Sequence, residues 1–456
     1  MRGNSAKIPR FTLIPNINED ESMTQEPRIL DEEKHGIPLS SIDINARKVL
    51  NRLHDAGFRA CLVGGGVRDL MLGIKPKDFD VATDATPDEV KRLFRNARLI
   101  GRRFRLAHVR YGRDIIEVAT FRAPHDEAIE DAEALVEESG RILRDNVYGS
   151  LEQDVWRRDF TINSLYYDIA DGSVIDYTGG VSDLREGVLR MIGDSEQRYH
   201  EDPVRMLRAV RFAAKLGFHI DPEAEHIIIE LAHLLGAAPP ARLFEEFLKL
   251  MHGGAAYETF LLLRKYQLFG QLFPETEQAL KREGGEGFLR FIGNALKNTD
   301  KRIQEGKPVN PAFLVAVLLW NPVLTAQLAH IKKGLPEFVA LQKASQEVLS
   351  RVVRHVAVPR RFSTQSREIW ELQQRLHKNR GKQPYRLIKT DRFRAGYDFL
   401  CLRAHSGEDD LISLCDWWTR FQEENPAAVP AAAPARRRRQ PAKRRPRRRK
   451  AGTAKE

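Results

Sequence analysis

The sequence predicts an α+β protein: a head built from a small mixed sheet with helices, then an all-α body, then a disordered basic tail. Three observations predict this order. Apolar strand-like runs alternate with helical patterns up to about residue 193, helical patterns dominate beyond it, and the surplus positive charge lies at the C-terminal end. A chain of 456 residues with 42% hydrophobic residues can fill several domain cores.

The expected head starts with a helix. An amphipathic pattern from Ser41 ends at Gly57, and an apolar strand at 59–63 (RACLV) follows. The glycines at 64–66 then make a turn that opens another helix. The remaining strands of the head are expected at 78–83, 105–112 and 114–122, with a helix that starts at the Thr86-Pro87 cap.

The rest of the chain has fewer strand signals. Residues 124–149 are acidic and weakly apolar, which indicates a long loop or a mobile insertion. After about Asp194 the expected strands stop, and helical patterns continue from Pro203 to the tail. The predicted organisation is a polar N-terminal extension at 1–40, a head at 41–193, a helical neck at 194–260, a helical body at 261–425, and a disordered arginine-rich tail at 426–456.

The net charge of +11 comes from the end of the chain. Residues 435–456 hold 12 of the 74 Lys and Arg residues and one of the 63 acidic residues, which leaves 62 of each for the preceding chain. Such a segment repels itself and has no apolar group to bury, so it is expected to be disordered. A flexible polycation binds phosphate backbones through counterion release. The tail therefore predicts nucleic-acid binding, with attraction to a membrane surface as the alternative.

Cysteine and hydropathy patterns limit the class of protein. Cys61, Cys401 and Cys415 show no CxxC spacing, so we expect core thiols rather than a disulfide framework or a zinc site. The chain has no apolar run of about 18 residues, and residues 1–20 lack the apolar centre of a secretory signal. The expected location is the cytoplasm.

The most specific pattern combines a glycine turn with two carboxylates. A strand and Gly64-Gly65 are followed, after twelve residues, by Asp78-Phe79-Asp80. Side chains at i and i+2 of a strand project from one face, so Asp78 and Asp80 can share a pair of cations while Phe79 points into the core. Two metals about 3.5–4 Å apart serve in-line phosphoryl transfer. The glycine turn offers backbone N–H groups to a triphosphate.

These motifs resemble a known family. The segments LVGGGVRD, DFDVAT, RRDFTIN and EDPVRMLRAVRFA are similar to those of the polymerase-β-like nucleotidyltransferases, within them the class II group of bacterial poly(A) polymerases and tRNA CCA-adding enzymes. The resemblance covers roughly Ser41 to Leu250. It implies that the head at 41–193 is catalytic, that the neck at 194–260 binds nucleotide and RNA, and that the body at 261–425 binds RNA. It implies a polymerase-β-like head and two Mg²⁺ ions, for which Mn²⁺ can substitute. It also implies that Arg68 and Asp69 contact triphosphate or incoming RNA, with a surface ion pair as the alternative.

A third carboxylate should complete the metal site, and two positions compete for it. Glu117 lies on the neighbouring strand 114–122, which makes it the better geometric ligand. Asp159 belongs to the RRD segment, which in the resembled family lies against the nucleotide sugar and phosphates. The expected catalytic residues are Asp78, Asp80 and Asp159, and the expected metal ligands are Asp78, Asp80 and Glu117.

The start of the helix expected from Pro203 has a capping interpretation and a nucleotide-binding interpretation. Asp202 is a natural N-cap and Pro203 suits the first helical position, which explains both residues structurally. The resemblance implies that Asp202 and Arg205 read the base edge. Arg208 and Arg211 share the polar face of this helix with Arg205. The expected nucleotide-binding residues are Gly64, Gly65, Arg68, Arg158, Asn163, Asp202, Arg205, Arg208 and Arg211.

The core motifs do not separate A-tail synthesis from CCA addition. Residues 99–109 (LIGRRFRLAHV) and the SLEQD lead-in to RRDFTINSLYYD resemble the bacterial poly(A) polymerase branch. A basic tail also suits an enzyme that holds diverse RNA. The His-Asp pairs at 54–55 and 125–126 precede the helical body, so a phosphohydrolase activity is not expected. The expected RNA contacts are Arg102, Arg103, Arg436, Arg437, Arg444, Arg445, Arg447 and Arg448.

The sequence thus predicts a template-independent poly(A) polymerase that adds AMP from ATP to RNA 3′ ends and promotes RNA turnover. Its expected partners are ATP, the 3′ ends of mRNA, small RNAs and tRNA, and RNA-decay proteins. A CCA-adding tRNA nucleotidyltransferase is the alternative. A non-catalytic RNA-binding protein on a transferase scaffold is a second alternative. A protein of that kind would be expected to lack a metal-binding carboxylate, whereas all the expected ones are present: Asp78, Asp80, Glu117 and Asp159.

Overall fold

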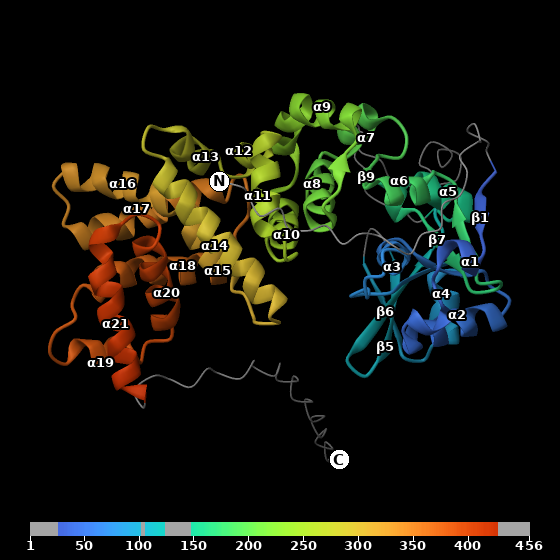
Figure 1. Cartoon of the computed structure of the whole chain (residues 1–456), viewed down its shortest axis with the longest axis horizontal. Coiled ribbons are helices and arrows are strands. Elements are labelled where there is room, and N and C mark those ends of the chain that lie inside the picture. The colour runs from blue at the N-terminus through green and yellow to red at the C-terminus, as the bar shows by residue number, and fades with distance from the viewer. Residues whose placement is uncertain (1–25, 102–104, 124–146, 427–456) are drawn as a thin grey trace, which may run out of the picture. The chain divides into compact units, whose positions relative to one another are not determined.

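The computed structural model describes residues 26–101, 105–123 and 147–426. The predictions for Arg102 and Arg103, for most of the acidic stretch and for the arginine tail therefore lie outside the described residues. The chain divides into two compact units, one up to Arg367 and one from Glu368. Among the residues described, the first unit contains a sheet and many helices, and the second is helical (Figure 1).

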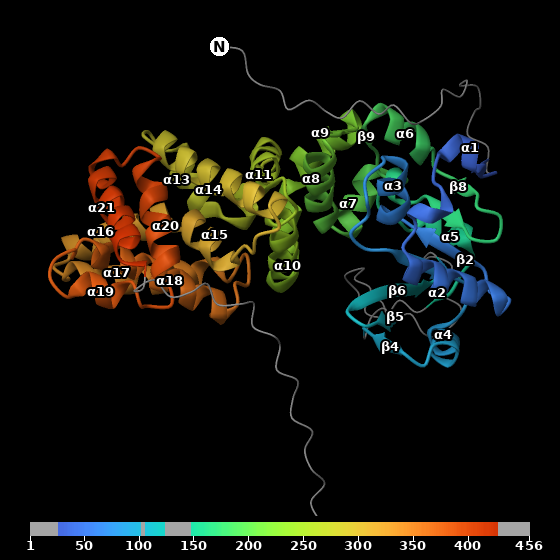
Figure 2. The ribbon, with the colours of Figure 1, turned by 60° about the horizontal axis from the view of Figure 1, so that its bottom comes forward.

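An eight-stranded mixed sheet forms the centre of the head, with the strand order β1-β8-β7-β2-β3-β6-β5-β4. In this sheet β3 and β6 pair in parallel, and the other neighbouring strands are antiparallel. Figure 2 shows β4, β5 and β6 side by side, close to helix α4 (Pro87–Leu93). The strands are β1 (Arg28–Leu30), β2 (Ala60–Val63), β3 (Asp80–Thr83), β4 (Ala97–Ile100), β5 (Leu106–Tyr111), β6 (Asp114–Thr120), β7 (Tyr166–Asp168) and β8 (Val174–Asp176).

The first strand–turn–helix unit forms as predicted. Helix α2 (Ile44–Asp55) starts after Asp43, whose carboxylate accepts hydrogen bonds from two backbone N–H groups of the first turn. Every residue of β2 is buried, so this strand runs through the core of the head. Gly64 follows with φ of 67°, a conformation that glycine adopts without strain, and α3 (Gly65–Met71) begins directly after it.

One core cluster of the head lies between the sheet and α5 (Leu151–Trp156). Both the helix and the strands contribute apolar side chains to it, since alternate strand residues face the same side. The cluster contains Cys61, Val63, Ala82, Phe121, Leu151, Val155, Tyr166 and Ile175. This cluster packs α5 against the central strands and so fixes the position of the RRD segment that follows α5.

Short strands depart from the expected pattern. β1 pairs with β8, so part of the polar N-terminal stretch belongs to the head sheet. After Asp194, β10 (His219–Ile220) pairs in parallel with β9 (Val188–Leu189), so the strands do not stop where expected. Strands of two or three residues carry no alternation, and their partners alone define them. β3 begins at Asp80, which leaves Asp78 just before the strand.

Helices make up most of the first unit beyond the head, as predicted. α8 carries the EDPVR segment and buries Leu207 and Val210, opposite its arginines. The helices from residue 180 are α6 (Gly180–Glu186), α7 (Ser195–Glu201), α8 (Val204–Leu216), α9 (Pro222–Leu231), α10 (Pro240–Met251), α11 (Ala256–Lys265), α12 (Leu268–Leu272), α13 (Pro274–Lys281), α14 (Glu286–Gln304), α15 (Pro311–Leu318), α16 (Trp320–Lys332) and α17 (Glu337–Val352).

The second unit packs around Trp418, which is fully buried and donates its indole N–H to the Leu376 carbonyl oxygen at 3.0 Å. Its helices are the end of α18 (Arg360–Leu376), α19 (Gln383–Leu387), α20 (Phe393–Ala404) and α21 (Ile412–Glu424). Cys401 and Cys415 form a disulfide between α20 and α21, so the expectation of free thiols is wrong for this pair. Helix packing creates this proximity, which spacing along the chain does not reveal. Cys61 is a buried free thiol, as predicted.

Membrane-spanning character is weak in the described parts of the chain. No single helix there is long and apolar enough to cross a bilayer. One pair, α15 and α16, passes that test together by length and composition, with a bend of 53° between its helices.

Candidate active site

A row of residues crosses the sheet at the end of β2. Asp80 on β3 is in register with Val63 on β2 and with Glu117 on β6. The row continues to His108 on β5 and, in the other direction, to Tyr166 on β7. Residues directly opposite one another in neighbouring strands share a face of the sheet. The Asp80 and Glu117 carboxylates therefore project from the same side.

Negative charge is concentrated in this row. Phe79 is buried, as predicted, whereas Asp78 and Asp80 are exposed. The pKa of Asp80 is raised to about 6, because neighbouring atoms remove water from the carboxylate and because Glu117 and Asp78 add negative charge. Arg158 offsets part of this effect. A cation bound among these carboxylates would relieve their repulsion.

These carboxylates fit a divalent cation by their chemistry. Within the described residues, no three His, Cys, Asp or Glu side chains converge closely enough to hold a metal ion. Glu117 also contacts His108, with Oε1 3.1 Å from Nε2. Carboxylate oxygens are nevertheless the ligands that Mg²⁺ prefers, and the raised pKa of Asp80 indicates negative charge that lacks compensation. Asp78, Asp80 and Glu117 could therefore hold the metal.

The glycine turn lies against the segment that contains Arg158. An added Cβ at Gly64 would lie 3.4 Å from the Asn163 carbonyl oxygen and 3.5 Å from Arg158 Nη1. Arg158 is fixed by two partners: its Nη2 donates to Asp154 at 2.9 Å and its Nε to the Tyr166 hydroxyl at 2.6 Å. The structure therefore brings Gly64 and Arg158 together, where N–H groups and a guanidinium can face a triphosphate.

Arg68 lies inside the head rather than in an open site. Its side chain is 3% exposed, and its Nη2 and Nε both donate to Asp69 Oδ1, at 2.5 and 2.8 Å. Its Nη1 donates to Asn163 Oδ1 at 2.5 Å. The ion pair with Asp69 thus forms, although in the interior and not on the surface. This geometry makes Arg68 and Asn163 a buried link between α3 and the RRD segment.

Asp159 is bound by an arginine of α8. Arg208 donates from Nε to Asp159 Oδ2 at 2.5 Å, and the Phe160 N–H donates to Oδ1 at 3.0 Å. Burial alone would raise the pKa of Asp159, but the Arg208 charge and the hydrogen bonds lower it overall. Asp159 therefore already has a cationic partner on α8.

Asp202 and Arg205 lie at the start of α8. Pro203, rather than Asp202, occupies the N-cap position, one residue later than expected. Asp202 Oδ2 accepts from Arg242 Nη2 of α10 at 2.6 Å. Arg205 Nη1 donates to Glu201 Oε2 at 2.7 Å. Both side chains are therefore oriented by protein partners, as groups that read a base edge need to be.

Arg211 differs from the other arginines of α8. Its guanidinium carbon lies 4.5 Å from the centroid of the Phe212 ring, which Arg68 and Arg208 also approach, at 5.2 and 5.7 Å. Its Nε has no hydrogen-bond partner among the residues described. The pKa of Arg211 is lowered, by burial and by the Arg208 charge. Such an arginine suits an anionic ligand.

Sequence reasoning missed several residues of this region. His108 contacts Glu117 through strand register, and Asp154 contacts Arg158 four residues further along the chain. Arg242 reaches Asp202 across 40 residues of chain. The alternation in 105–112 could have shown that His108 lies on the same face as Arg110. No sequence signal identifies its partner on the next strand.

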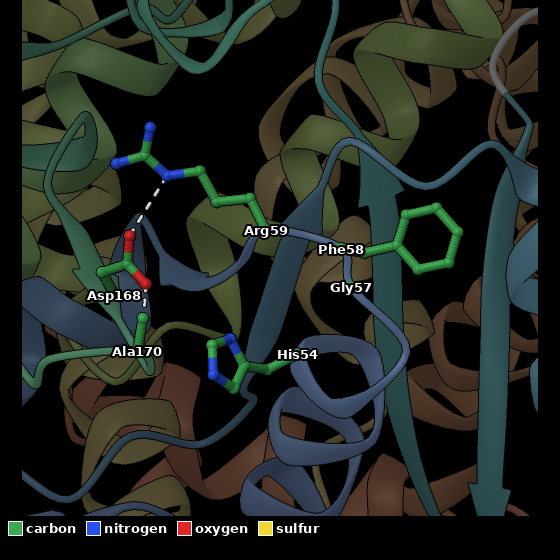
Figure 3. A pocket seen from close by; sticks show the side chains of 6 residues that line it. All are labelled: His54, Gly57, Phe58, Arg59, Asp168 and Ala170. Atoms are coloured by element: carbon green, nitrogen blue, oxygen red, sulfur yellow. Dashed lines mark hydrogen bonds and ion pairs between the residues drawn. The ribbon is translucent and has the colours of Figure 1, made fainter.

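A pocket of about 300 Å³ lies elsewhere in the head, lined in part by His54, Arg59 and Asp168 (Figure 3). Arg59 Nε donates to Asp168 Oδ2 at 3.1 Å. Arg59 precedes β2, whereas Gly64 follows it, so the pocket lies at the opposite end of this strand from the glycine turn. The pocket is therefore separate from the carboxylates.

Comparison with known families assigns three parts of the chain. Residues 60–190 match the poly A polymerase head domain, 217–280 match a probable RNA- and SrmB-binding site of polymerase A, and 333–451 match the polymerase A arginine-rich C-terminus. The sheet with its carboxylates thus coincides with the head domain.

Solved structures with a similar fold include CCA-adding enzymes. The apo form II of one such enzyme matches with a TM-score of 0.61 at 19% identity, covering 87% of each chain. A complex of a CCA-adding enzyme with ATP matches with a TM-score of 0.59 at 19% identity, covering 87% of this chain and 86% of that one. These similarities confirm the predicted fold class, a mixed-sheet head with helices followed by a helical body.

Curated relatives distinguish the branches of this class. Poly(A) polymerase I of Salmonella typhimurium strain LT2 is 50% identical over 426 residues, 92% of each chain, and that of Haemophilus influenzae is 47% identical over 84% of this chain and 85% of its own. The CCA-adding enzyme of Bacillus subtilis is 38% identical over 51% of this chain and 56% of its own. The chain belongs to the poly(A) polymerase I family. It is therefore a polynucleotide adenylyltransferase, as predicted, and enzymes of this kind use divalent metal ions.

Proposed function

We propose that the chain adds AMP units from ATP to RNA 3′ ends without a template, releases pyrophosphate and thereby promotes RNA turnover in the cytoplasm. The observation that carries the proposal is the row of carboxylates at the end of β2, in which Asp80 is in register with Glu117 and follows Asp78 by two residues. The similarity to poly(A) polymerases over 92% of the chain supports the choice of product.

Asp78, Asp80 and Glu117 would hold two Mg²⁺ ions, for which Mn²⁺ can substitute. Ions held there would supply the positive charge that activates the attacking RNA 3′ hydroxyl and neutralises the departing pyrophosphate. The turn at Gly64-Gly65 and the Arg158 guanidinium are proposed to bind the triphosphate. Arg158 is suited to this because Asp154 and Tyr166 fix its Nε and Nη2, which leaves Nη1 directed at the turn.

Recognition of adenine is proposed for the start of α8. Asp202 offers an acceptor and Arg205 offers donors, and Arg242 and Glu201 restrict their rotation. Arg208 and Asp159 brace this helix against the RRD segment. Arg211 is proposed to bind a phosphate, because its charge lacks a hydrogen-bonding partner at Nε. Arg68 and Asn163 are proposed to position the glycine turn from inside the head.

RNA binding is proposed for the basic segments. Arg102, Arg103 and the arginines at 436, 437, 444, 445, 447 and 448 would contact phosphates without reading sequence. The 3′ ends of mRNA, small RNAs and tRNA are the proposed substrates, and RNA-decay proteins are the proposed partners. Such binding matches an enzyme that must accept many RNA ends.

The test is extension of a generic RNA with ATP, CTP or both in the presence of Mg²⁺. We expect long tails of A alone from the wild-type chain. Asp78→Ala and Asp80→Ala should each lower transfer by at least about 10³-fold while RNA binding persists, because the charge of the metal site is lost. Tailing by either variant at the wild-type rate would refute the metal assignment.

CCA addition is the second candidate, because solved structures with a similar fold include CCA-adding enzymes. A tRNA that lacks its CCA end separates the two functions. Incorporation from CTP that stops after three additions would identify CCA addition. A-only extension of both RNAs would identify poly(A) synthesis.

A further inference from the structure

His108 is the closest described partner of the proposed third metal ligand. It lies on β5, in register with Glu117 on β6, and Glu117 is in register with Asp80 on β3. The Nε2 of His108 is 3.1 Å from Glu117 Oε1. Three neighbouring strands thus present an imidazole and two carboxylates in one line on one face of the sheet.

His108 is more deeply buried than Glu117. The His108 side chain is 19% exposed, so the strand and its neighbours hold the ring, whereas the Glu117 side chain is 48% exposed. A fixed donor that engages Oε1 restricts an otherwise mobile glutamate. The second oxygen, Oε2, is then left for a cation shared with Asp80.

Such a donor matters because the carboxylates repel one another. Asp78 and Glu117 both contribute negative charge at Asp80. Without a partner, the exposed Glu117 side chain would minimise this repulsion by turning toward solvent. Carboxylates that bind metals are commonly held by a hydrogen bond from the protein, and loss of that bond weakens metal affinity about 10- to 100-fold.

We infer that His108 is a positioning residue for the metal site: its Nε2–H holds Glu117 beside Asp80 so that the three carboxylates can bind a divalent cation together. This inference rests on the proposed function of Asp78, Asp80 and Glu117. It also gives the segment 99–109 a physical role, because this segment brings the imidazole into the row.

The competing account is a cross-strand pair that only stabilises the sheet. That account predicts a lower melting temperature on substitution and no change in metal affinity. Metal binding therefore has to be measured directly, on the full-length protein without substrate, as well as through activity.

The test compares His108→Ala with His108→Gln. Glutamine can donate from its amide nitrogen near the position of Nε2, whereas alanine cannot donate. We expect His108→Ala to weaken Mn²⁺ binding, measured by electron paramagnetic resonance, about 10- to 100-fold and to raise the half-saturating Mg²⁺ concentration similarly. The KM for RNA should stay unchanged, and His108→Gln should recover most of the affinity.

Two controls keep the result interpretable. His54→Ala removes an imidazole at the opposite end of β2 and should leave Mn²⁺ binding unchanged (Figure 3). Glu117→Gln should weaken binding on its own, and adding His108→Ala to it should cause little further loss if the two act as a unit.

Unchanged Mn²⁺ affinity in His108→Ala, with or without a lower melting temperature, would overturn the inference. Failure of the proposed function has a different signature, because the wild-type chain would then show no transfer with Mg²⁺ and ATP. In that case a weaker Mn²⁺ site in His108→Ala would still support the positioning role.

Discussion

At the scale of single residues, Asp80 is the side chain whose environment is most informative. It heads β3, it is in register with Glu117, and Asp78 precedes it by two residues. A carboxylate with a pKa raised to about 6 is one whose ionised form lacks a stabilising partner in the metal-free protein. A site built to bind a cation has this property before the cation arrives.

The raised pKa of Asp80 predicts how metal-free stability depends on pH. The folded pKa of about 6 exceeds the ordinary 3.8, so the folded state binds more protons between these values and loses stability as the pH rises through this window. Asp80→Asn removes the effect. The measurement is the free energy of unfolding in urea, with a chelator present. At pH 7 the variant should be more stable than wild type by about 1 kcal/mol, a value that allows for screening of the exposed carboxylate by solvent. At pH 4 the variant should show no gain in stability.

A difference between Asp80→Asn and wild type that is the same at pH 4 and pH 7 would contradict this explanation. The matched control is Asp88→Asn. Asp88 is an exposed carboxylate of α4, paired with Arg105 at 3.2 Å, and it stands apart from the carboxylate row. This substitution should show no pH-dependent gain.

Several site residues could be predicted from sequence and others could not. The glycine turn comes from local geometry, which a short motif encodes, whereas β3 begins at Asp80, two residues later than the strand predicted from Asp78. The pairs Asp159–Arg208 and Asp202–Arg242 join residues 49 and 40 positions apart, so only tertiary packing defines them. Strand register likewise places Glu117 directly across from Asp80.

At the scale of elements, the short 3-10 turn at Thr161–Asn163 is held by close packing of α6. An added Cβ at Gly180, the first residue of α6, would lie 2.3 Å from the Thr161 carbonyl oxygen. Asp183 of α6 also accepts from the Thr161 hydroxyl at 2.6 Å. Because Asn163 of this turn binds Arg68, the packing of α6 reaches the region behind the glycine turn.

Gly180→Ala should therefore destabilise the head. Overpacking of a close backbone contact costs about 1–3 kcal/mol in the free energy of unfolding, and displacement of Asn163 should also lower the transfer rate. Gly236→Ala is the control, because an added Cβ there meets nothing within 4 Å. Equal denaturation midpoints for the two variants would contradict the assignment of Gly180 as a packing contact.

The elements also show where sequence patterns fail. Helices α2 and α4 have side-chain caps and apolar faces, and both were predicted close to their observed starts. The edge strand β1 and the pair β9–β10 were missed, since each has two or three residues and depends on a distant partner. The disulfide between Cys401 and Cys415 was missed for the same reason.

At the scale of the whole molecule, charge is divided unequally along the chain. The residues before Ala435 carry equal numbers of acidic and basic groups, and the segment 435–456 carries the whole excess of +11. The preceding part has no net charge with which to attract RNA over a distance. The terminal segment can supply this attraction, because phosphate binding by Lys and Arg is independent of sequence.

Deletion of the chain after Pro434 should therefore weaken RNA binding and flatten its dependence on salt. Each phosphate contact that is lost reduces the slope of log K against log salt by about 0.7 for single strands. The rate of transfer at saturating RNA should remain close to wild type. An unchanged slope, measured by fluorescence anisotropy over a salt series, would show that the tail makes no substantial contact with RNA.

The central claim is that Asp78, Asp80 and Glu117 share divalent cations beside the glycine turn. Anomalous diffraction from crystals grown with Mn²⁺ and a non-hydrolysable ATP analogue tests it most directly. The account predicts manganese peaks within about 2.0–2.5 Å of oxygens from all three carboxylates, with the triphosphate against Gly64. Manganese bound elsewhere, with Glu117 oriented away from Asp80, would contradict it.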